Sequence, residues 1–256
     1  YAMKMAHRIC AMDPDSHYQG TVKTVNGNPV WTGKIATAQG KTLLDPLHWP
    51  SPRMVFVNSM GDLFHEGVRE DWINDIFAIM ALCRQHIFVI LTKRPERMQD
   101  YIRTHAAGLM PWPLPNVWLG VSAENQAEAD ARIPILLATP ATKRIVSVEP
   151  MLGPVDLRNI QFGDELFYGT KNALTGVVTC LEFPGELRPG KSLDWVICGG
   201  ESGAGRRRFN PVWAEIVRDQ CELAGVPFFF KQHIGRGIDD DLLDGVRHHN
   251  WPEARP

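Results

Sequence analysis

The stretch HIFVILTKRPERM (residues 86–98) sets the fold class of this chain. Its first half is a continuous apolar run rich in β-branched residues, which stops at polar residues and a proline. A continuous run, rather than an alternating one, is typical of a strand that is buried on both faces of a parallel sheet. The stretch therefore predicts such a strand, with Lys93 directly after it.

Five further stretches have the same character. They are RMVFVNSMGDLF (53–64), NVWLGVSAEN (116–125), KRIVSVEPMLGPV (143–155), LDWVICGGESG (193–203) and PFFFKQ (227–232). Helical patterns lie between some of them and cover residues 69–83, 125–139 and 211–225. This alternation predicts an α/β fold with a parallel sheet of six visible strands. We expect a partial or full (β/α) barrel, with one more strand upstream of Tyr1; an open, doubly wound sheet is the alternative.

We interpret residues 1–256 as a single domain that is incomplete at its N-terminus. Tyr1, Met5 and Ile9 already recur at helical spacing, so the chain opens inside a helix. Two insertions interrupt the strand–helix pattern, at about 13–50 and 156–192. The second contains a predicted hairpin around NALTGVVTCLEF (172–183). Long insertions at strand ends often act as lids or substrate loops.

Composition excludes several classes of protein. The 256 residues include 44% hydrophobic and 22% charged residues, as in an ordinary globular protein, and the net charge of −2 gives no global basic field. Five scattered cysteines without a C-x-x-C pair favour reduced thiols and a cytoplasmic protein. No apolar run approaches the length of a membrane span, so we expect no membrane partner.

Polar side chains follow each predicted strand. They are Asp62, Lys93, Ser122, Glu124, Glu149, Glu201 and Lys231. In a parallel barrel the carboxyl ends of the strands converge on one face, where ligands bind. Ordinary structural roles stay open for three of them: a helix cap for Asp62, a lysine at the edge of the sheet for Lys93, and a strand-tip carboxylate held by the following proline for Glu149.

The stretch ICGGESGAGRRRF (197–209) is the strongest candidate for an anion site. Glycines after a strand, followed by Arg206, Arg207 and Arg208, are suited to phosphate. The glycine spacing matches neither a dinucleotide fingerprint nor a P-loop, and a solvated arginine loop is the alternative. The histidines form no metal motif, and no G-x-S-x-G elbow of a serine hydrolase is present.

Six motifs in order along the chain resemble one family. They are FVNSMGDLFHEGV (56–68), LTKRPERM (91–98), PLPNVWLGVSAEN (113–125), SVEPMLGPVDL (147–157), DWVICGGESG (194–203) and AGVPFFFKQ (224–232), accompanied by WTGK (31–34) and LDG (243–245). The family is the three-cysteine-motif family of phage and bacterial proteins. Its members are similar to radical S-adenosylmethionine (SAM) proteins, and their layout is similar to that of the spore photoproduct lyase branch.

The resemblance implies a [4Fe-4S] cluster and SAM as cofactors. The family's third cluster cysteine directly precedes a Tyr-Ala pair, so the resemblance places all three cysteines upstream of Tyr1 and no metal ligand in this chain; Cys10 does not replace them. By position, Met60, Gly61 and Asp62 would lie near the SAM amino group, Lys93 near its carboxylate and Ser122 near carboxylate or ribose. Glu124 and Glu149 would contact ribose or substrate, and Glu201, Arg206, Arg207, Arg208 and Lys231 would bind substrate or an anion.

Three functions are consistent with these residues. The first is a radical SAM-type enzyme that abstracts hydrogen from a nucleic-acid base or nucleotide, which the resemblance implies. The second is a non-catalytic barrel module that binds nucleic acid or a partner protein. The third is a metal-independent barrel enzyme that acts on a phosphorylated small molecule, which would bind near Gly199–Arg208.

Overall fold

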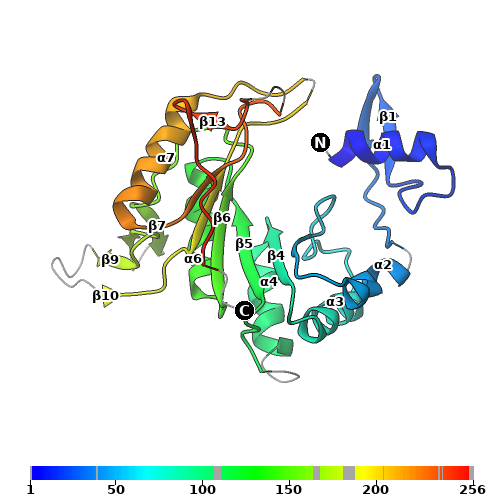
Figure 1. Ribbon diagram of the computed structural model, residues 1–256, viewed down its shortest axis with the longest axis horizontal. Helices are drawn as coiled ribbons and strands as arrows, with labels where there is room; N and C mark the ends of the chain where they lie inside the picture. Colours follow the sequence, from blue (N-terminus) through cyan, green and yellow to red (C-terminus); the bar gives the residue numbers. More distant parts are fainter. Residues whose placement is uncertain are drawn as a thin grey trace. The chain divides into compact units, whose positions relative to one another are not determined.

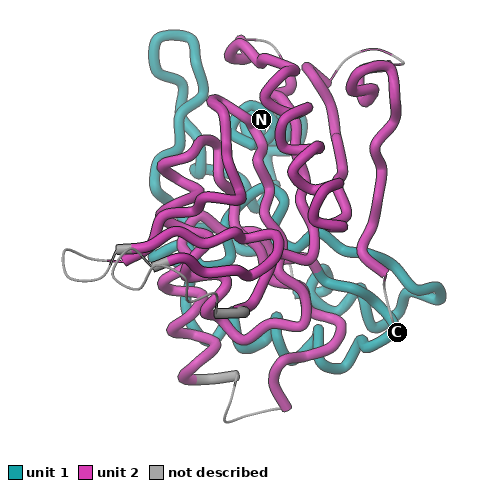
Figure 2. Tube along the Cα trace, turned by 90° about the vertical axis from the view of Figure 1, so that its left-hand side faces the viewer, with its two compact units in different colours: residues 1–88 teal, residues 89–256 magenta. Residues whose placement is uncertain are grey.

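The structure, a computed structural model, describes residues 2–38, 40–106, 111–163, 168–180, 188–203, 205–235, 237 and 239–253. The chain divides into two compact units, Tyr1–Phe88 and Val89–Pro256 (Figure 2). Each unit is described by itself below, and the single-domain organisation stays a prediction. None of the described helices combines the length and the apolar character that crossing a membrane requires.

The main sheet contains the six strands that the apolar runs predict (Figure 1). They are β3 (Met54–Val57), β4 (Ile87–Thr92), β5 (Val117–Ser122), β6 (Lys143–Val148), β11 (Trp195–Cys198) and β12 (Phe228–Phe230). The strand order is β12-β11-β6-β5-β4-β3. The strands are parallel, and the sheet is curled into a half-barrel flanked by helices. The prediction of an α/β fold with a partial parallel barrel is therefore confirmed.

The central strands are buried on both faces, as their continuous apolar sequences require. All residues of β5 except Ser122 are buried, and so are all residues of β6 except Lys143. In β3, by contrast, exposed Met54 and Phe56 alternate with half-buried residues. The strand order places β3 at an edge of the sheet, and an edge strand lacks a neighbour on one side.

The register of the strands puts their carboxyl ends at one level. Ser122 of β5 pairs with Ser147 of β6. Cys198 of β11 pairs with Val148 of β6 on one side and with Phe230 of β12 on the other. The residues that follow β5, β6, β11 and β12 consequently emerge along the same edge of the sheet.

Three helices match their sequence predictions to within one residue at each end. They are α3 (Glu70–Leu82), α6 (Gln126–Ala138) and α7 (Pro211–Ala224). The side chain of Asn125 caps α6 by accepting from the backbone N–H of Glu128, and α7 ends at Gly225 in the left-handed conformation with φ of 67°. Helix α6 packs on β5 and β6, and α7 packs on β12.

The remaining helices are shorter or lie near the N-terminus. The unit Tyr1–Phe88 contains α1 (Ala2–Met12), α2 (Gly40–Leu44) and the 3-10 helix η1 (Asp45–His48). The unit Val89–Pro256 contains α4 (Pro95–Tyr101), which continues into the π-helical turn η2 (Ile102–Ala106). The N-terminal stretch is thus helical as predicted, with Tyr1 itself outside the described residues.

Both predicted insertions carry structure of their own. Within 13–50, β1 (Val22–Val25) and β2 (Asn28–Trp31) form a hairpin that packs against α1. Within 156–192 lies an antiparallel sheet of order β10-β9-β8-β7, formed by β7 (Ile160–Gly163), β8 (Tyr168–Lys171), β9 (Val177–Cys180) and β10 (Arg188–Pro189). The predicted hairpin (172–183) contains the turn after β8 and the strand β9, whereas β8 itself precedes its predicted start; residues 181–183 lie outside the described residues. A small hairpin of β13 (Leu242–Leu243) and β14 (Val246–Arg247) follows β12.

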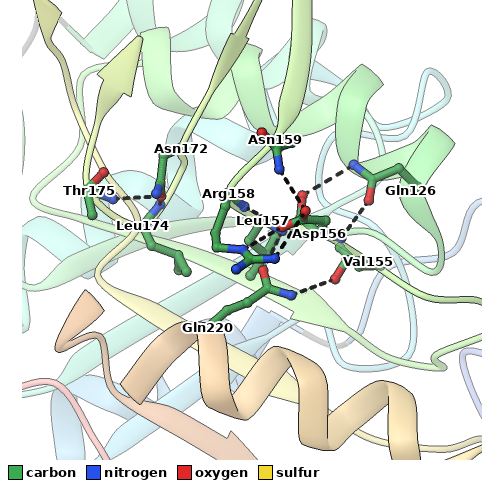
Figure 3. A network of polar contacts seen from close by, with 10 residues as sticks. All are labelled: Gln126, Val155, Asp156, Leu157, Arg158, Asn159, Asn172, Leu174, Thr175 and Gln220. Atoms are coloured by element: carbon green, nitrogen blue, oxygen red, sulfur yellow. Dashed lines mark hydrogen bonds and ion pairs between the residues drawn. The ribbon is translucent and has the colours of Figure 1, made fainter. Parts of the chain in front are cut away.

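Two glutamines, buried Gln220 and half-buried Gln126, anchor the start of the second insertion (Figure 3). Gln220 of α7 accepts from the backbone N–H of Leu157 at 2.8 Å and donates to the carbonyl oxygen of Val155 at 3.2 Å. Gln126 of α6 accepts from the backbone N–H of Asp156 at 2.6 Å. Only 3% of Gln220 is exposed, so its amide replaces water for two main-chain groups of a buried segment.

We expect Gln220→Leu to lower the free energy of unfolding by about 1–3 kcal/mol, because it leaves a buried N–H and a buried carbonyl without partners. Urea denaturation followed by circular dichroism measures this change. The matched control is Gln161→Leu, since Gln161 is exposed on β7; its effect should stay within about 0.5 kcal/mol. Equal effects of the two substitutions would contradict the anchoring role of Gln220.

Candidate functional site

A buried carboxylate lies between two cations at the carboxyl ends of β4 and β5. Lys93, directly after β4, forms an ion pair through Nζ with Oε1 of Glu124. Nη1 of Arg132, on α6, lies 3.0 Å from Oε2 of Glu124 and donates to the carbonyl oxygen of Ser122 at 2.7 Å. The side chain of Glu124 is only 10% exposed, whereas that of Lys93 is 48% exposed. Lys93 therefore offers its ammonium group to solvent or to a ligand while Glu124 holds it in place.

A second ion pair lies at the carboxyl ends of β6 and β12. Nζ of Lys231 is 2.9 Å from Oε1 and 3.2 Å from Oε2 of Glu149, and Nε2 of Gln232 donates to the same Oε1 at 3.3 Å. The side chain of Glu149 is 19% exposed. The Glu149–Pro150 peptide bond is cis. Lys231 thus neutralises a carboxylate that emerges directly from β6.

Main-chain hydrogen bonds tie these strand-end loops together. The backbone N–H of Leu152 donates to the carbonyl oxygen of Glu124 at 2.8 Å. The backbone N–H of Met151 donates to the carbonyl oxygen of Gly199 at 2.9 Å. The segment after Glu149 is therefore bonded to the loop after β5 and to the loop after β11. Within the unit Val89–Pro256, the structure places the predicted residues Lys93, Ser122, Glu124, Glu149 and Lys231 along one edge of the sheet, as the sequence predicts.

The glycine loop after β11 is hydrogen-bonded to the segment after β12. The backbone N–H of Gly200 donates to the carbonyl oxygen of Gln232 at 2.8 Å. A Cβ atom at position 200 would overlap the carbonyl oxygen of His233, so only glycine allows this approach.

An ion pair closes the loop that follows these glycines. The carboxylate of Glu201 accepts from the backbone N–H and Nε of Arg207, each at 2.9 Å, and from Nη2 at 3.1 Å. These hydrogen bonds hold the pKa of Glu201 below its ordinary value and raise that of Arg207. Glu201 and Arg207 are therefore occupied with each other, which the sequence did not reveal.

The three consecutive arginines line a cavity of about 610 Å³. Its other walls include Phe209 from the loop before α7, Pro211 at the start of α7, and His233 and Ile234 from the segment after β12. The predicted anion-site residues Arg206, Arg207 and Arg208 are thus brought together at a hollow surface.

Met60, Gly61 and Asp62 belong to the unit Tyr1–Phe88, where they form a turn after β3. The backbone N–H of Gly61 donates to the carbonyl oxygen of Asn58 at 2.9 Å. Oδ1 of Asp62 accepts from the backbone N–H of Phe64 at 3.0 Å. Asp62 therefore closes a turn and does not cap α3, whose N-cap is Arg69. Their expected contact with the SAM amino group stays a prediction.

Arg132 and Gln232 are site residues that sequence reasoning missed. Arg132 lies four residues after Glu128 and forms an ion pair with it. In the sequence this spacing indicates only an ion pair on the exposed face of a helix. Its contact with Glu124 depends on the packing of α6 over β5, which local sequence does not specify. Gln232 follows Lys231, and its position just after a predicted strand is the sequence feature that could have identified it as a site residue.

The described residues include no group of three histidine, cysteine, aspartate or glutamate side chains that could hold a metal ion. Cys83, Cys198 and Cys221 are buried, and burial raises the pKa of each thiol, that of Cys221 to about 12. Cys10 lies in α1 and is half-buried. The three buried thiols are therefore poorly suited to act as thiolate ligands.

Comparison with known proteins gives a family and no named relative. A family model described as "Protein of unknown function (DUF5131)" matches residues 1–251, and the chain belongs to this family. The search of curated proteins and the search of solved structures each found no match.

Arg207→Gln should raise the pKa of Glu201 toward the ordinary glutamate value, because it removes the side-chain donors that favour the carboxylate. Since the folded-state pKa of Glu201 is depressed, this pair contributes stability above the unfolded-state pKa and loses it as the pH falls through the folded-state pKa. Carboxyl ¹³C NMR titration measures the shift. Arg206→Gln is the matched control and should leave the pKa of Glu201 in place; an unchanged pKa in Arg207→Gln would refute the assignment.

Proposed function

We propose that this member of the DUF5131 family binds SAM at the carboxyl ends of β4, β5, β6 and β12. We further propose that it forms the SAM-binding part of a radical SAM-type enzyme whose substrate is a nucleic-acid base or nucleotide. The motifs LTKRPERM (91–98), PLPNVWLGVSAEN (113–125) and SVEPMLGPVDL (147–157) support this, since they resemble the radical SAM-like three-cysteine-motif family and carry the site residues.

The observation that carries the proposal is the ion pair between half-exposed Lys93 and buried Glu124. Burying a carboxylate costs free energy that an ion pair only partly offsets, so such pairs are weak contributors to stability. They are common where a ligand's charge must be met by a fixed counter-charge. Lys93 remains half-exposed and is held by Glu124, which gives a positioned ammonium group for a ligand carboxylate.

The chemistry of the donor set fits SAM. The molecule has an amino-acid carboxylate, an amino group and ribose hydroxyl groups. Lys93 would bind the carboxylate, and the hydroxyl group of Ser122 would bind the carboxylate or the ribose. Glu149 would accept hydrogen bonds from the ribose hydroxyl groups, with Lys231 holding its carboxylate in place.

Bound with an iron–sulfur cluster, SAM supplies a radical that abstracts hydrogen from the substrate. The described residues contain no ligand set for the cluster. In this proposal the cluster ligands are the three cysteines that the resemblance implies. In this proposal the residues of this chain bind and orient SAM.

A second candidate function is supported by the cavity beside Arg206–Arg208. A barrel enzyme that acts on a phosphorylated small molecule without SAM would use this cavity alone. The two functions differ in a simple readout, because only the first requires SAM to bind at Lys93 and Ser122.

Isothermal titration calorimetry of the chain with SAM tests the proposal. We expect Glu124→Gln and Ser122→Ala each to weaken SAM binding about tenfold, which corresponds to one lost hydrogen bond of about 1.4 kcal/mol. Ser122→Ala is the second site variant because Glu124→Gln also removes the carboxylate that pairs with Lys93 and Arg132, and this loss could disturb the local fold. The matched control is Glu222→Gln, an exposed carboxylate on α7 that should leave the affinity unchanged. Absence of SAM binding, or equal effects of control and site variants, would overturn the proposal.

A further inference from the structure

The cavity next to the arginine loop has the size and the lining of a ligand pocket. Its volume of about 610 Å³ lies within the range of pockets that hold small molecules, about 300–1,000 Å³. One part of its wall is cationic, formed by Arg206, Arg207 and Arg208. Another part is apolar and aromatic, formed by Phe209 and Ile234.

Two of the three arginines are available to a ligand. Arg207 is committed to Glu201 through two side-chain hydrogen bonds. Arg206 makes one long contact, 3.5 Å from Nη1 to the carbonyl oxygen of Gly203. Within the described part of the chain, neither Arg206 nor Arg208 forms an ion pair with a carboxylate. Two planar guanidinium groups two residues apart suit the oxygens of a phosphate group.

The walls of the pocket are held in place by contacts that do not depend on a ligand. Phe209 stacks on Phe230 with ring centroids 6.1 Å apart, and its centroid lies 5.6 Å from that of His233. The carbonyl oxygen of Leu242 accepts from Nε2 of His233 at 2.6 Å. The carboxylate of Asp240 accepts from the backbone N–H of Ile234. A pocket with fixed walls binds more tightly because less conformational freedom is lost.

The combined lining selects the class of ligand. Inorganic phosphate would form ion pairs with the arginines but would leave the aromatic wall of the pocket exposed to water. A purely apolar ligand would leave the two guanidinium groups without a counter-charge. A nucleotide has a phosphate at one end, which can pair with the arginines, and a flat base at the other, which can pack on the aromatic wall. Nε2 of His233 donates to the carbonyl oxygen of Leu242, so Nδ1 is the ring nitrogen that is left for a polar group of the ligand.

We propose that the pocket between residues 205–211 and residues 233–234 binds a mononucleotide, with its phosphate on Arg206 and Arg208 and its base against Phe209. That the nucleotide is the substrate of a SAM-dependent reaction rests on the proposed function. That a nucleotide binds here is inferred from the lining of the pocket alone. Long nucleic acids bind through many phosphates, whereas this loop offers two free arginines and the net charge of the chain is −2.

Calorimetric titration with the 5′-monophosphates of adenosine, guanosine, cytidine and uridine, each alone, tests the inference. At least one should bind more tightly than its nucleoside and more tightly than inorganic phosphate. Arg208→Gln should weaken this binding about tenfold through loss of a charge-assisted hydrogen bond. The matched control is Arg84→Gln, another exposed arginine without an ion pair among the described residues, which should change the affinity less than twofold.

Several results would overturn the inference. They are no binding of any monophosphate, binding that Arg208→Gln leaves unchanged, and binding of a single-stranded oligonucleotide without binding of any monophosphate. A parallel titration with SAM separates this inference from the proposed function. Monophosphate binding without SAM binding would leave the pocket assignment standing and remove the SAM assignment, and the reverse result would do the opposite. SAM that competes with the monophosphate for the same pocket would count against the placement of SAM at the ends of β4, β5, β6 and β12.

Discussion

Parallel pairing of β5, β6, β11 and β12 is the constraint on which the candidate site depends. Because Ser122 is level with Ser147, and Cys198 with both Val148 and Phe230, four loops leave the sheet along one edge. The loops then bond to one another through main-chain groups. A shift of one residue in any pair would turn the alternating side chains to the opposite faces and would separate the polar groups.

The charges along this edge follow from their burial. A buried carboxylate loses hydration worth on the order of several kcal/mol, and it must be met by cations and hydrogen-bond donors. Glu124 has Lys93 and Arg132, Glu149 has Lys231 and Gln232, and Glu201 has Arg207. Lys93 and Lys231 are themselves about half-exposed, so each of these two pairs presents a positive group that the protein has already positioned. This pattern resembles preorganisation for an anionic ligand more than reinforcement of the fold.

The sequence predicted those features that depend on periodicity and strand direction. Continuous apolar runs identified all six strands, and the parallel arrangement implied that Lys93 and Glu124 share one edge. The exposed face of β3 was not predicted, because burial of a strand depends on its place in the sheet rather than on its composition. The partnership of Glu201 with Arg207 and the reach of Arg132 from α6 to Glu124 were also missed. Both depend on how a loop or a helix is placed in three dimensions, which local spacing does not encode.

The central claim is that the edge formed by Lys93, Ser122, Glu124 and Glu149 binds SAM. The most direct measurement is a crystal structure of the chain grown with SAM. The account predicts ligand density at this edge, with the SAM carboxylate on Lys93 and its ribose near Ser122 or Glu149. Density for SAM elsewhere, or an edge without ligand at a concentration that saturates binding in solution, would contradict it.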